Sequence, residues 1–121
     1  MNIEELHSFC LQQKGTTEHF PFDDVTLVFK VMGKMYALIS LKSWENGEQK
    51  INLKCNPERA IDLRNEFEGI NAGWHMNKKH WNTVTINQDV SDKTVFELIN
   101  HSYELVVKGL TRKLQNELKS M

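Results

Sequence analysis

The N-terminal part of the chain has the hydrophobic spacing of an α-helix. The apolar side chains that share one face of such a helix are Ile3, Leu6 and Cys10, with Phe9 at its edge. Asn2 can accept a hydrogen bond from the backbone of Glu5, whose side chain can return one, so the pair can form a capping box. Gly15 is a residue type that commonly follows a last helical turn. The pattern therefore predicts a helix over residues 3–13.

The hydrophobic pattern changes to a period of two after a connector that contains Pro21. The alternating apolar residues are Val25, Leu27, Phe29 and Val31. Such alternation is typical of a β-strand with one buried face. Residues 32–34 predict a short turn. The segment 35–41 is apolar at nearly every position, which predicts a second strand in the interior of a sheet.

Two further signals mark elements in the middle of the chain. Asn46-Gly47 is a dipeptide favoured in tight β-hairpins, and Ile51 and Leu53 predict a third strand after it. Residues 56–58 combine a capping asparagine, a proline suited to the first helical position and an acidic residue in the first turn. They predict a second helix, which ends near Gly69.

The C-terminal third of the chain is predicted to be helical after one more strand. Residues 70–81 follow no regular period, and residues 83–86 predict a strand. Ser91 and Thr111 can cap two amphipathic segments, a long helix and a short one. The predicted order is helix, three strands, helix, strand, helix, helix. Strands joined by hairpins and flanked by helices indicate an α+β fold, an antiparallel sheet covered by helices.

The length and composition are those of a globular domain. The chain has 121 residues, of which 40% are hydrophobic and 26% charged, and no linker interrupts it, so residues 1–121 are predicted to form a single domain. No apolar run approaches the ~20 residues that span a bilayer. The N-terminus lacks the basic and apolar regions of a secretory signal. We therefore expect a cytoplasmic monomer without a membrane partner, in which Cys10 and Cys55 are free thiols.

The net charge of the chain argues against nucleic-acid binding, whereas the basic character of its middle segment favours it. The net charge is −1, whereas dedicated nucleic-acid binders are usually basic. The segment 1–29 carries five acidic side chains against one lysine, but the segment 30–82 carries nine Lys or Arg against six acidic residues. The basic residues of its predicted strands and turns are Lys30, Lys34, Lys42, Lys50 and Lys54. They could contact phosphates along DNA, or they could keep sheet edges soluble.

The segment 73–81 has the most unusual composition, with two tryptophans, two histidines and two lysines in nine residues. Its lysines could contact phosphates and its aromatic rings could stack on bases or support the loop. Alternatively, its tryptophans anchor the loop on the core. For DNA binding, the expected contact residues are Lys30, Lys34, Lys54, Lys78, Lys79, His80 and Trp81. The alternative function is a small-ligand or protein-interaction module, with a pocket formed by Cys55, Trp74, His75, Asn77 and His80.

No set of residues points to catalysis or to a cofactor. The chain contains no Gly-x-Ser-x-Gly, Walker or His-Glu-x-x-His motif. His75 and His80 are five residues apart, which suits neither one helix face nor one strand face, so we expect no metal site. Cys55 precedes a predicted helix, whose dipole could lower the thiol pKa, or it is simply a small buried residue. We therefore expect a protein without enzymatic activity and without a cofactor.

Several short motifs, taken in order, resemble those of the MmcQ/YjbR family. They are Gly15-Thr16-Thr17-Glu18, Phe20-Pro21-Phe22, the segments 30–38, 52–58 and 75–81, and Ser102-Tyr103. The resemblance implies a frataxin-like (CyaY-like) fold with helices packed on one side of an antiparallel sheet. It also implies a double-wing DNA-binding role, with wings at the hairpins near Gly33 and Asn46-Gly47. A frataxin-like iron role does not transfer, because the first helix offers only Glu4 and Glu5 as acidic residues near its start.

Overall fold

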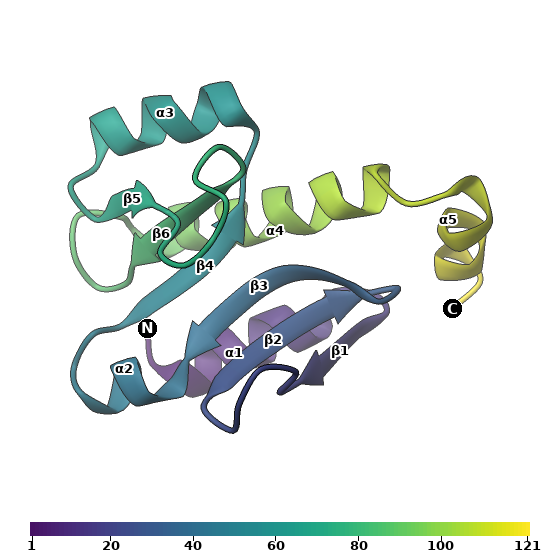
Figure 1. Ribbon diagram of the computed structural model, residues 1–121, viewed down its shortest axis with the longest axis horizontal. Helices are drawn as coiled ribbons and strands as arrows, with labels where there is room; N and C mark the ends of the chain where they lie inside the picture. The colour runs from purple at the N-terminus through teal and green to yellow at the C-terminus, as the bar shows by residue number, and fades with distance from the viewer.

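The computed structural model describes residues 1–121 and consists of one six-stranded sheet and five helices (Figure 1). The helices are α1 (Ile3–Gln12), α2 (Leu41–Glu45), α3 (Pro57–Glu66), α4 (Asp92–Lys108) and α5 (Arg112–Lys119). The strands are β1 (Thr16–His19), β2 (Thr26–Val31), β3 (Lys34–Ser40), β4 (Lys50–Lys54), β5 (Ile70–Ala72) and β6 (Trp81–Thr85). All strand pairs are antiparallel, in the order β1-β2-β3-β4-β6-β5. The predicted α+β class with an antiparallel sheet is therefore confirmed.

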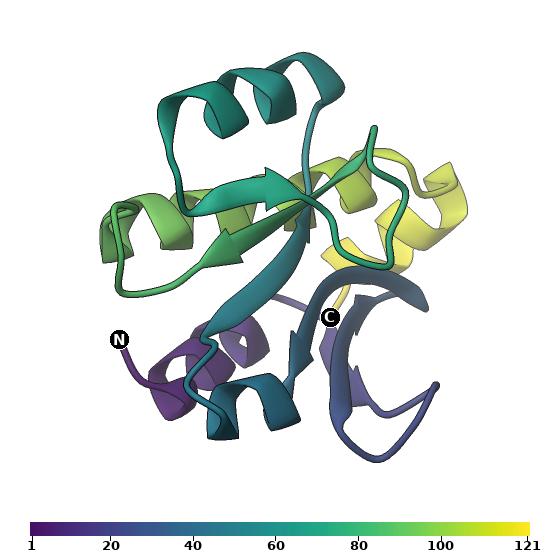
Figure 2. The same cartoon turned by 60° about the vertical axis from the view of Figure 1, so that its left-hand side comes forward.

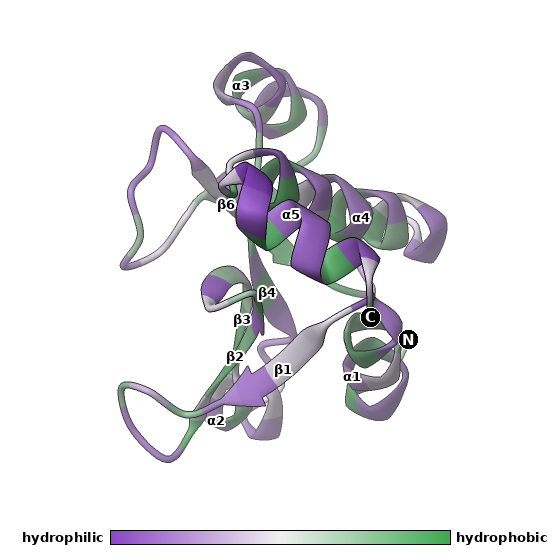
Figure 3. Cartoon of the chain, turned by 90° about the vertical axis from the view of Figure 1, so that its right-hand side faces the viewer, coloured by the Kyte–Doolittle hydropathy of each residue, from purple (hydrophilic) through white to green (hydrophobic).

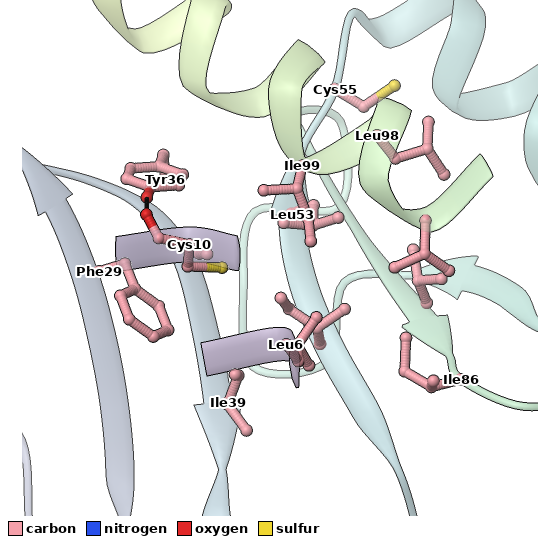
Figure 4. Packing of buried hydrophobic residues seen from close by; sticks show 14 of the residues in the cluster. Leu6, Cys10, Phe29, Tyr36, Ile39, Leu53, Cys55, Ile86, Leu98 and Ile99 are labelled. Carbon is pink, nitrogen blue, oxygen red and sulfur yellow. Dashed lines mark hydrogen bonds between the residues drawn. The ribbon is translucent and has the colours of Figure 1, made fainter. Parts of the chain in front are cut away.

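One face of the sheet is covered by helices, and the main core lies beneath them. Figure 3 shows α1, α4 and α5 on one side of the sheet and two loops projecting from the other side. Figure 2 shows α3 lying alongside β5 at one end of the sheet. The core includes Leu6 of α1, Phe29 and Ile39 of the sheet, and Ile99 of α4 (Figure 4). Because side chains alternate along a strand, the residues next to Phe29 and Ile39 point away from these helices.

The helix starts predicted from capping residues are confirmed. Asn2 and Glu5 make both hydrogen bonds of the capping box at the start of α1. The side chain of Asn56 accepts hydrogen bonds from two N–H groups in the first turn of α3. Ser91 and Thr111 accept equivalent bonds at the starts of α4 and α5. Each cap depends on residues within one helical turn, which is why the sequence alone could predict it.

The prediction of a tight hairpin at Asn46-Gly47 is wrong. The short helix α2 precedes this dipeptide, and Asn46 is its C-terminal cap. Gly47 has a φ of 84°, and this left-handed conformation ends a helix as readily as it turns a hairpin. The second wing implied by the resemblance is therefore a helical connection. The predicted turn between β2 and β3 is confirmed, since Met32 and Gly33 both have positive φ values, 50° and 81°.

The hydrophobic pattern did not reveal the two edge strands. β1, with the sequence Thr-Thr-Glu-His, contains no apolar residue, and β5 has only three residues. β1 pairs only with β2, and β5 only with β6. A short strand that pairs along one side and lies at an edge carries little hydrophobic periodicity. The boundary of α1 also differs, because the helix ends at Gln12 and Gly15 lies in the turn that leads into β1.

The hydroxyl of Ser102 joins the backbones of two diverging strands. β3 and β4 are paired over only two residues each, and Figure 1 shows them spreading apart beyond these pairs. The next pair in this register would be Tyr36 and Lys54. There the Oγ of Ser102, buried on α4, accepts a hydrogen bond from the Lys54 N–H (2.9 Å) and donates one to the Tyr36 carbonyl (2.5 Å). The side chain thus takes the place of a missing hydrogen bond between the strands.

Candidate functional site

The helix-free face of the sheet, called the open face from here on, brings together side chains from four strands. They include Thr26, Val28, Lys30, Leu38, Ser40, Lys50, Asn52, Lys54, Trp81 and Thr83. Three of these residues are lysines, and β2, β3, β4 and β6 contain no acidic residue at all. The open face of the sheet is therefore basic, although the whole chain is slightly acidic.

A cleft of about 520 Å³ lies on the open face, between the loop 20–25 and the loop 73–80. Figure 3 shows both loops standing out from the sheet on the same side. The residues that line the cleft are Phe22, Asp23, Thr26, Leu38, Ser40, Ser43, Lys50, Asn52, Trp74, His75, Met76 and Thr83. Small-molecule sites commonly measure roughly 300–1,000 Å³, so this cleft has the size of a binding site.

The floor of the cleft holds the backbone of Trp74 in place. The hydroxyl of Thr83 donates to the side-chain oxygen of Asn52 (2.6 Å) and accepts from the Trp74 N–H (2.9 Å). The amide nitrogen of Asn52 donates to the Trp74 carbonyl (3.2 Å). Asn52 and Thr83 are direct partners on β4 and β6, so the pairing of these strands creates the anchor. Both backbone groups of Trp74 are thereby bound to the sheet.

The ring of Trp74 is held at the surface next to two cationic or ionisable groups. The residue is 56% exposed, and its ring stacks on the ring of His75, with centroids 5.0 Å apart. The ammonium group of Lys50 lies 5.7 Å from the centre of the Trp74 ring, within the range of a cation–π contact. Lys50 also pairs with Glu48 at 3.6 Å. An aromatic ring beside a cation can receive a planar ligand that carries negative charge.

The guanidinium group of Arg64 holds the far end of the same loop. From α3 it donates to the side-chain oxygen of Asn82 (2.6 Å), to the carbonyl of Trp81 (3.2 Å) and to the carbonyl of Lys78. Hydrogen bonds from a charged donor are roughly twice as strong as neutral ones. The loop is thus bound at both ends, by Trp74 to the sheet and by Arg64 to α3.

The opposite wall of the cleft is formed by Phe22 and Asp23. Phe22 is 64% exposed, which is unusual for a residue with so large an apolar side chain. The carboxylate of Asp23 accepts hydrogen bonds from the N–H groups of Val25 and Thr26 and from the Thr26 hydroxyl. These bonds lower the pKa of Asp23, chiefly the one from Val25, and they fix the turn that presents the Phe22 ring.

The lysines predicted to contact DNA lie on or beside the open face. Lys30 and Lys54 project from the sheet, and Lys34 lies at the tip of the hairpin between β2 and β3. Lys78 and Lys79 are exposed on the loop 73–80, where the ammonium group of Lys78 donates to a backbone carbonyl. None of the five forms an ion pair. Their charges are therefore free to meet an anionic partner.

The structure separates the two tryptophans that the sequence could not tell apart. Trp81 is only 8% exposed and packs on Val28 and Leu38, so its ring supports the loop and cannot stack on a ligand. Trp74 is the exposed one. His80, also predicted to contact DNA, is half-buried, and its carbonyl accepts a hydrogen bond from the Cys55 N–H.

The alternative pocket predicted from the sequence is only partly assembled. Trp74 and His75 line the cleft, but Cys55, Asn77 and His80 do not. Cys55 belongs to the main core, and burial raises the pKa of its thiol. Asn77 instead shapes the loop by accepting a hydrogen bond from a backbone N–H. The sequence-based prediction did not include four residues that line the cleft: Phe22, Ser40, Asn52 and Thr83. Their residue types alone do not indicate that they lie close together in the fold.

A histidine behind the sheet predicts how stability depends on pH. The ring nitrogen Nε2 of His101 accepts a hydrogen bond from the Asn56 N–H (3.2 Å), which requires a neutral ring. Burial, and then the charge of Arg59, hold the pKa of His101 below its usual range. As pH falls below about 6.5, the unfolded chain takes up a proton that the folded chain does not. We therefore expect the free energy of unfolding to decrease on acidification, until the pH reaches the folded-state pKa.

Urea unfolding of the wild type and of His101→Gln at about pH 7.5 and pH 5.5 would measure this effect, since these values bracket the usual histidine pKa. The wild type should lose more stability between the two pH values than the variant. Equal losses would show that His101 does not titrate differently in the folded and unfolded states.

Two classes of feature are absent from the structure. No group of three or more His, Cys, Asp or Glu side chains is arranged to hold a metal ion. None of the five helices combines the length and apolar character needed to cross a bilayer.

Comparison with known proteins finds related sequences and structures along nearly the whole chain. The sequence profile of the YjbR family matches residues 11–105. The chain is 36% identical over 100 residues to the uncharacterized protein YbdF of Escherichia coli O157:H7, covering 83% of this chain and 80% of the relative. It is 30% identical over 110 residues to the uncharacterized protein YjbR of Escherichia coli K12, covering 91% of each.

Two solved structures have a similar fold. The crystal structure of Deinococcus radiodurans protein DR2400 is 40% identical, with a TM-score of 0.85 over 98% of this chain and 88% of that one. A crystal structure of a Pseudomonas syringae protein is 29% identical, with a TM-score of 0.72 over 87% of this chain and 98% of that one. On these matches in sequence and fold, the chain belongs to the YjbR family.

Proposed function

We propose that the open face binds DNA weakly and with little sequence preference. The observation that carries the proposal is the charge of this face. β2, β3, β4 and β6 contain no acidic residue, and Lys30 and Lys54 project from them without an ion-pair partner. Unpaired lysines on such a surface favour phosphates, because neutralising a phosphate releases its condensed counterions.

The loops beside the sheet extend this basic surface. Lys78 and Lys79 add two exposed charges on the loop 73–80, and Lys34 adds one at the hairpin tip. The net charge of −1 means that acidic residues elsewhere oppose long-range attraction to DNA. Weak binding that depends on a local basic patch is therefore expected. Because phosphates are the same in every sequence, such contacts give little sequence preference.

The proposed function is binding, without a catalysed reaction. Cys55 was the one candidate nucleophile, and its buried thiol has a raised pKa, the opposite of an activated thiolate. The cleft on the open face also contains Ser40, Ser43, His75 and Asp23, but no hydrogen bond joins the His75 ring to a serine hydroxyl or to the Asp23 carboxylate, as a nucleophile, base and orienting group would require. These features suit recognition by charge and shape.

Fluorescence anisotropy with short labelled oligonucleotides tests the proposal. We expect binding at ~50 mM salt that weakens steeply by ~200 mM. The double variant Lys30→Gln with Lys54→Gln should bind more weakly. Its logarithmic salt slope should be shallower by about 0.7 for each phosphate of a single strand that the variant no longer neutralises.

The matched control removes two lysines from the opposite side of the molecule. Lys108→Gln with Lys113→Gln changes the net charge equally, but these residues lie on α4 and α5. An equal loss of affinity in both double variants would point to net charge rather than to the open face. No binding of any oligonucleotide at ~50 mM salt, where phosphate contacts are strongest, would refute the proposal.

A further inference from the structure

Exposed apolar side chains gather at the cleft. Seven large hydrophobic residues of the chain are exposed, and four of them lie on the two loops that flank the cleft: Phe20, Phe22, Val25 and Trp74. Single exposed apolar residues are ordinary, but a concentration around one concave site indicates a binding surface. The cleft therefore has two exposed aromatic residues among its walls, Phe22 from one loop and Trp74 from the other.

The floor of the cleft keeps hydrogen-bonding capacity beside an apolar side chain. Leu38 lies there among hydroxyl and amide side chains of the sheet, which include Ser40, Asn52 and Thr83. The amide nitrogen of Asn52 uses one of its two N–H groups for the Trp74 carbonyl, so the other can donate to a ligand. Lys50 provides a cation at the same site. Because Asp23 places a carboxylate on the wall shared with Phe22, a suitable occupant has flat apolar faces, a polar edge and a negative charge only on the side of Lys50.

We propose that the cleft takes one unpaired nucleobase, so that the protein binds single strands in preference to duplex. This inference rests on the proposed function, because it names the form of DNA that the open face recognises. The base would stack on Trp74 with its edge toward Asn52, and its phosphate would lie near Lys50. Bases within a duplex are stacked and paired, so they cannot enter a cleft walled by two projecting loops.

Other occupants fit this cleft less well. An acyl chain could contact Leu38 and Met76, but it would leave the free amide N–H of Asn52 without a hydrogen-bond partner. A peptide that adds a strand needs a free sheet edge, and the cleft lies on the face of the inner strands β2, β3, β4 and β6. A flat heteroaromatic ring is also favoured because the backbone of Trp74 is anchored and its ring stacks on His75, so the Trp74 side chain loses little freedom when a ligand stacks on it.

The test compares three ligands of one sequence: a labelled single strand, its duplex, and the single strand with abasic sites in place of its bases. The wild type should bind the normal single strand most tightly. Trp74→Ala should lose roughly 5- to 100-fold in affinity for that strand, as expected for one stacked base. Its salt slope should stay unchanged, because the lysines that neutralise phosphates are all still present. On the abasic strand the variant and the wild type should bind alike.

Two further variants and one unfolding measurement show whether a loss of affinity in Trp74→Ala comes from lost stacking, from general apolar contact or from a change in folding. Trp74→Phe keeps an aromatic ring and should recover much of the affinity. Ile61→Ala removes an equally exposed apolar side chain from α3, away from the cleft, and should change nothing. Thermal unfolding of Trp74→Ala should match that of the wild type, because the hydrogen bonds at this position are made by the backbone.

The outcomes distinguish this inference from the proposed function. The nucleobase site would be overturned if the duplex bound as tightly as the single strand, or if Trp74→Ala bound like the wild type. In either case, a loss of affinity in the Lys30 and Lys54 double variant would still support phosphate binding. Failure of every oligonucleotide to bind at low salt would overturn both.

Discussion

The Trp81→Ala variant is expected to lose about 3–5 kcal/mol of unfolding free energy, the usual cost of removing a buried aromatic side chain. Trp81 is 8% exposed, and its ring joins Val28 and Leu38 in the only buried apolar cluster on the open face. Its backbone carbonyl also accepts hydrogen bonds from Arg64 and from the N–H of Gly73 (2.8 Å). Loss of the ring leaves a cavity beneath the loop 73–80.

Trp74→Ala is the matched control for this prediction. The two residues are the same type and lie seven positions apart, one within the loop 73–80 and one directly after it, but Trp74 is 56% exposed. Its truncation should change the free energy of unfolding by less than about 0.5 kcal/mol, as is usual for surface positions. Urea unfolding of both variants measures the difference. Similar losses of stability in both variants would contradict the assignment of Trp81 as the ring that supports the fold and of Trp74 as a surface residue.

The second large effect is expected at Ser102, where Ser102→Ala should destabilise the fold by about 2–4 kcal/mol. The hydroxyl satisfies two backbone groups at once, the N–H of Lys54 and the carbonyl of Tyr36. Removing it leaves a buried donor and a buried acceptor without partners, and each costs about 1–3 kcal/mol. The side chain is only an oxygen atom larger than alanine, so reduced packing contributes little.

Ser8→Ala controls for the general effect of this substitution in a helix. Ser8 lies on the exposed side of α1 and makes no side-chain hydrogen bond, so the change should stay within about 0.5 kcal/mol. Denaturant unfolding of both variants would be compared with the wild type. If Ser102→Ala were as stable as Ser8→Ala, the two strands would have to close the gap and bond directly, and the bridging role would be wrong.

The sequence predicted those elements whose signals are local. The starts of four helices followed from Asn2, Asn56, Ser91 and Thr111, because a cap involves residues within one turn. β2, β3 and β4 followed from alternating or continuous apolar residues. The same reasoning failed for Asn46-Gly47, because a left-handed glycine serves both a hairpin and a helix end, and only the surrounding chain selects between them.

The sequence alone could not identify the candidate site, since its members come from separate parts of the chain. Phe22, Asn52 and Trp74 meet only because β4 pairs with β6 and two loops project from the same face. Which face is open was also undecided, because both faces of β2 and β3 carry apolar residues.

By itself, the sequence determined the class of fold, the helix starts and the family resemblance, because these rest on short-range periodicity, capping and ordered motifs. The tertiary structure decided which lysines share a face, which tryptophan is buried and where the cleft lies. Trp74 and Trp81 illustrate the reason: both stand in one segment of similar composition, and their exposure is set by the pairing of Trp81 with Lys54 across the sheet. Exposure depends on contacts between residues distant in sequence, which no local pattern records.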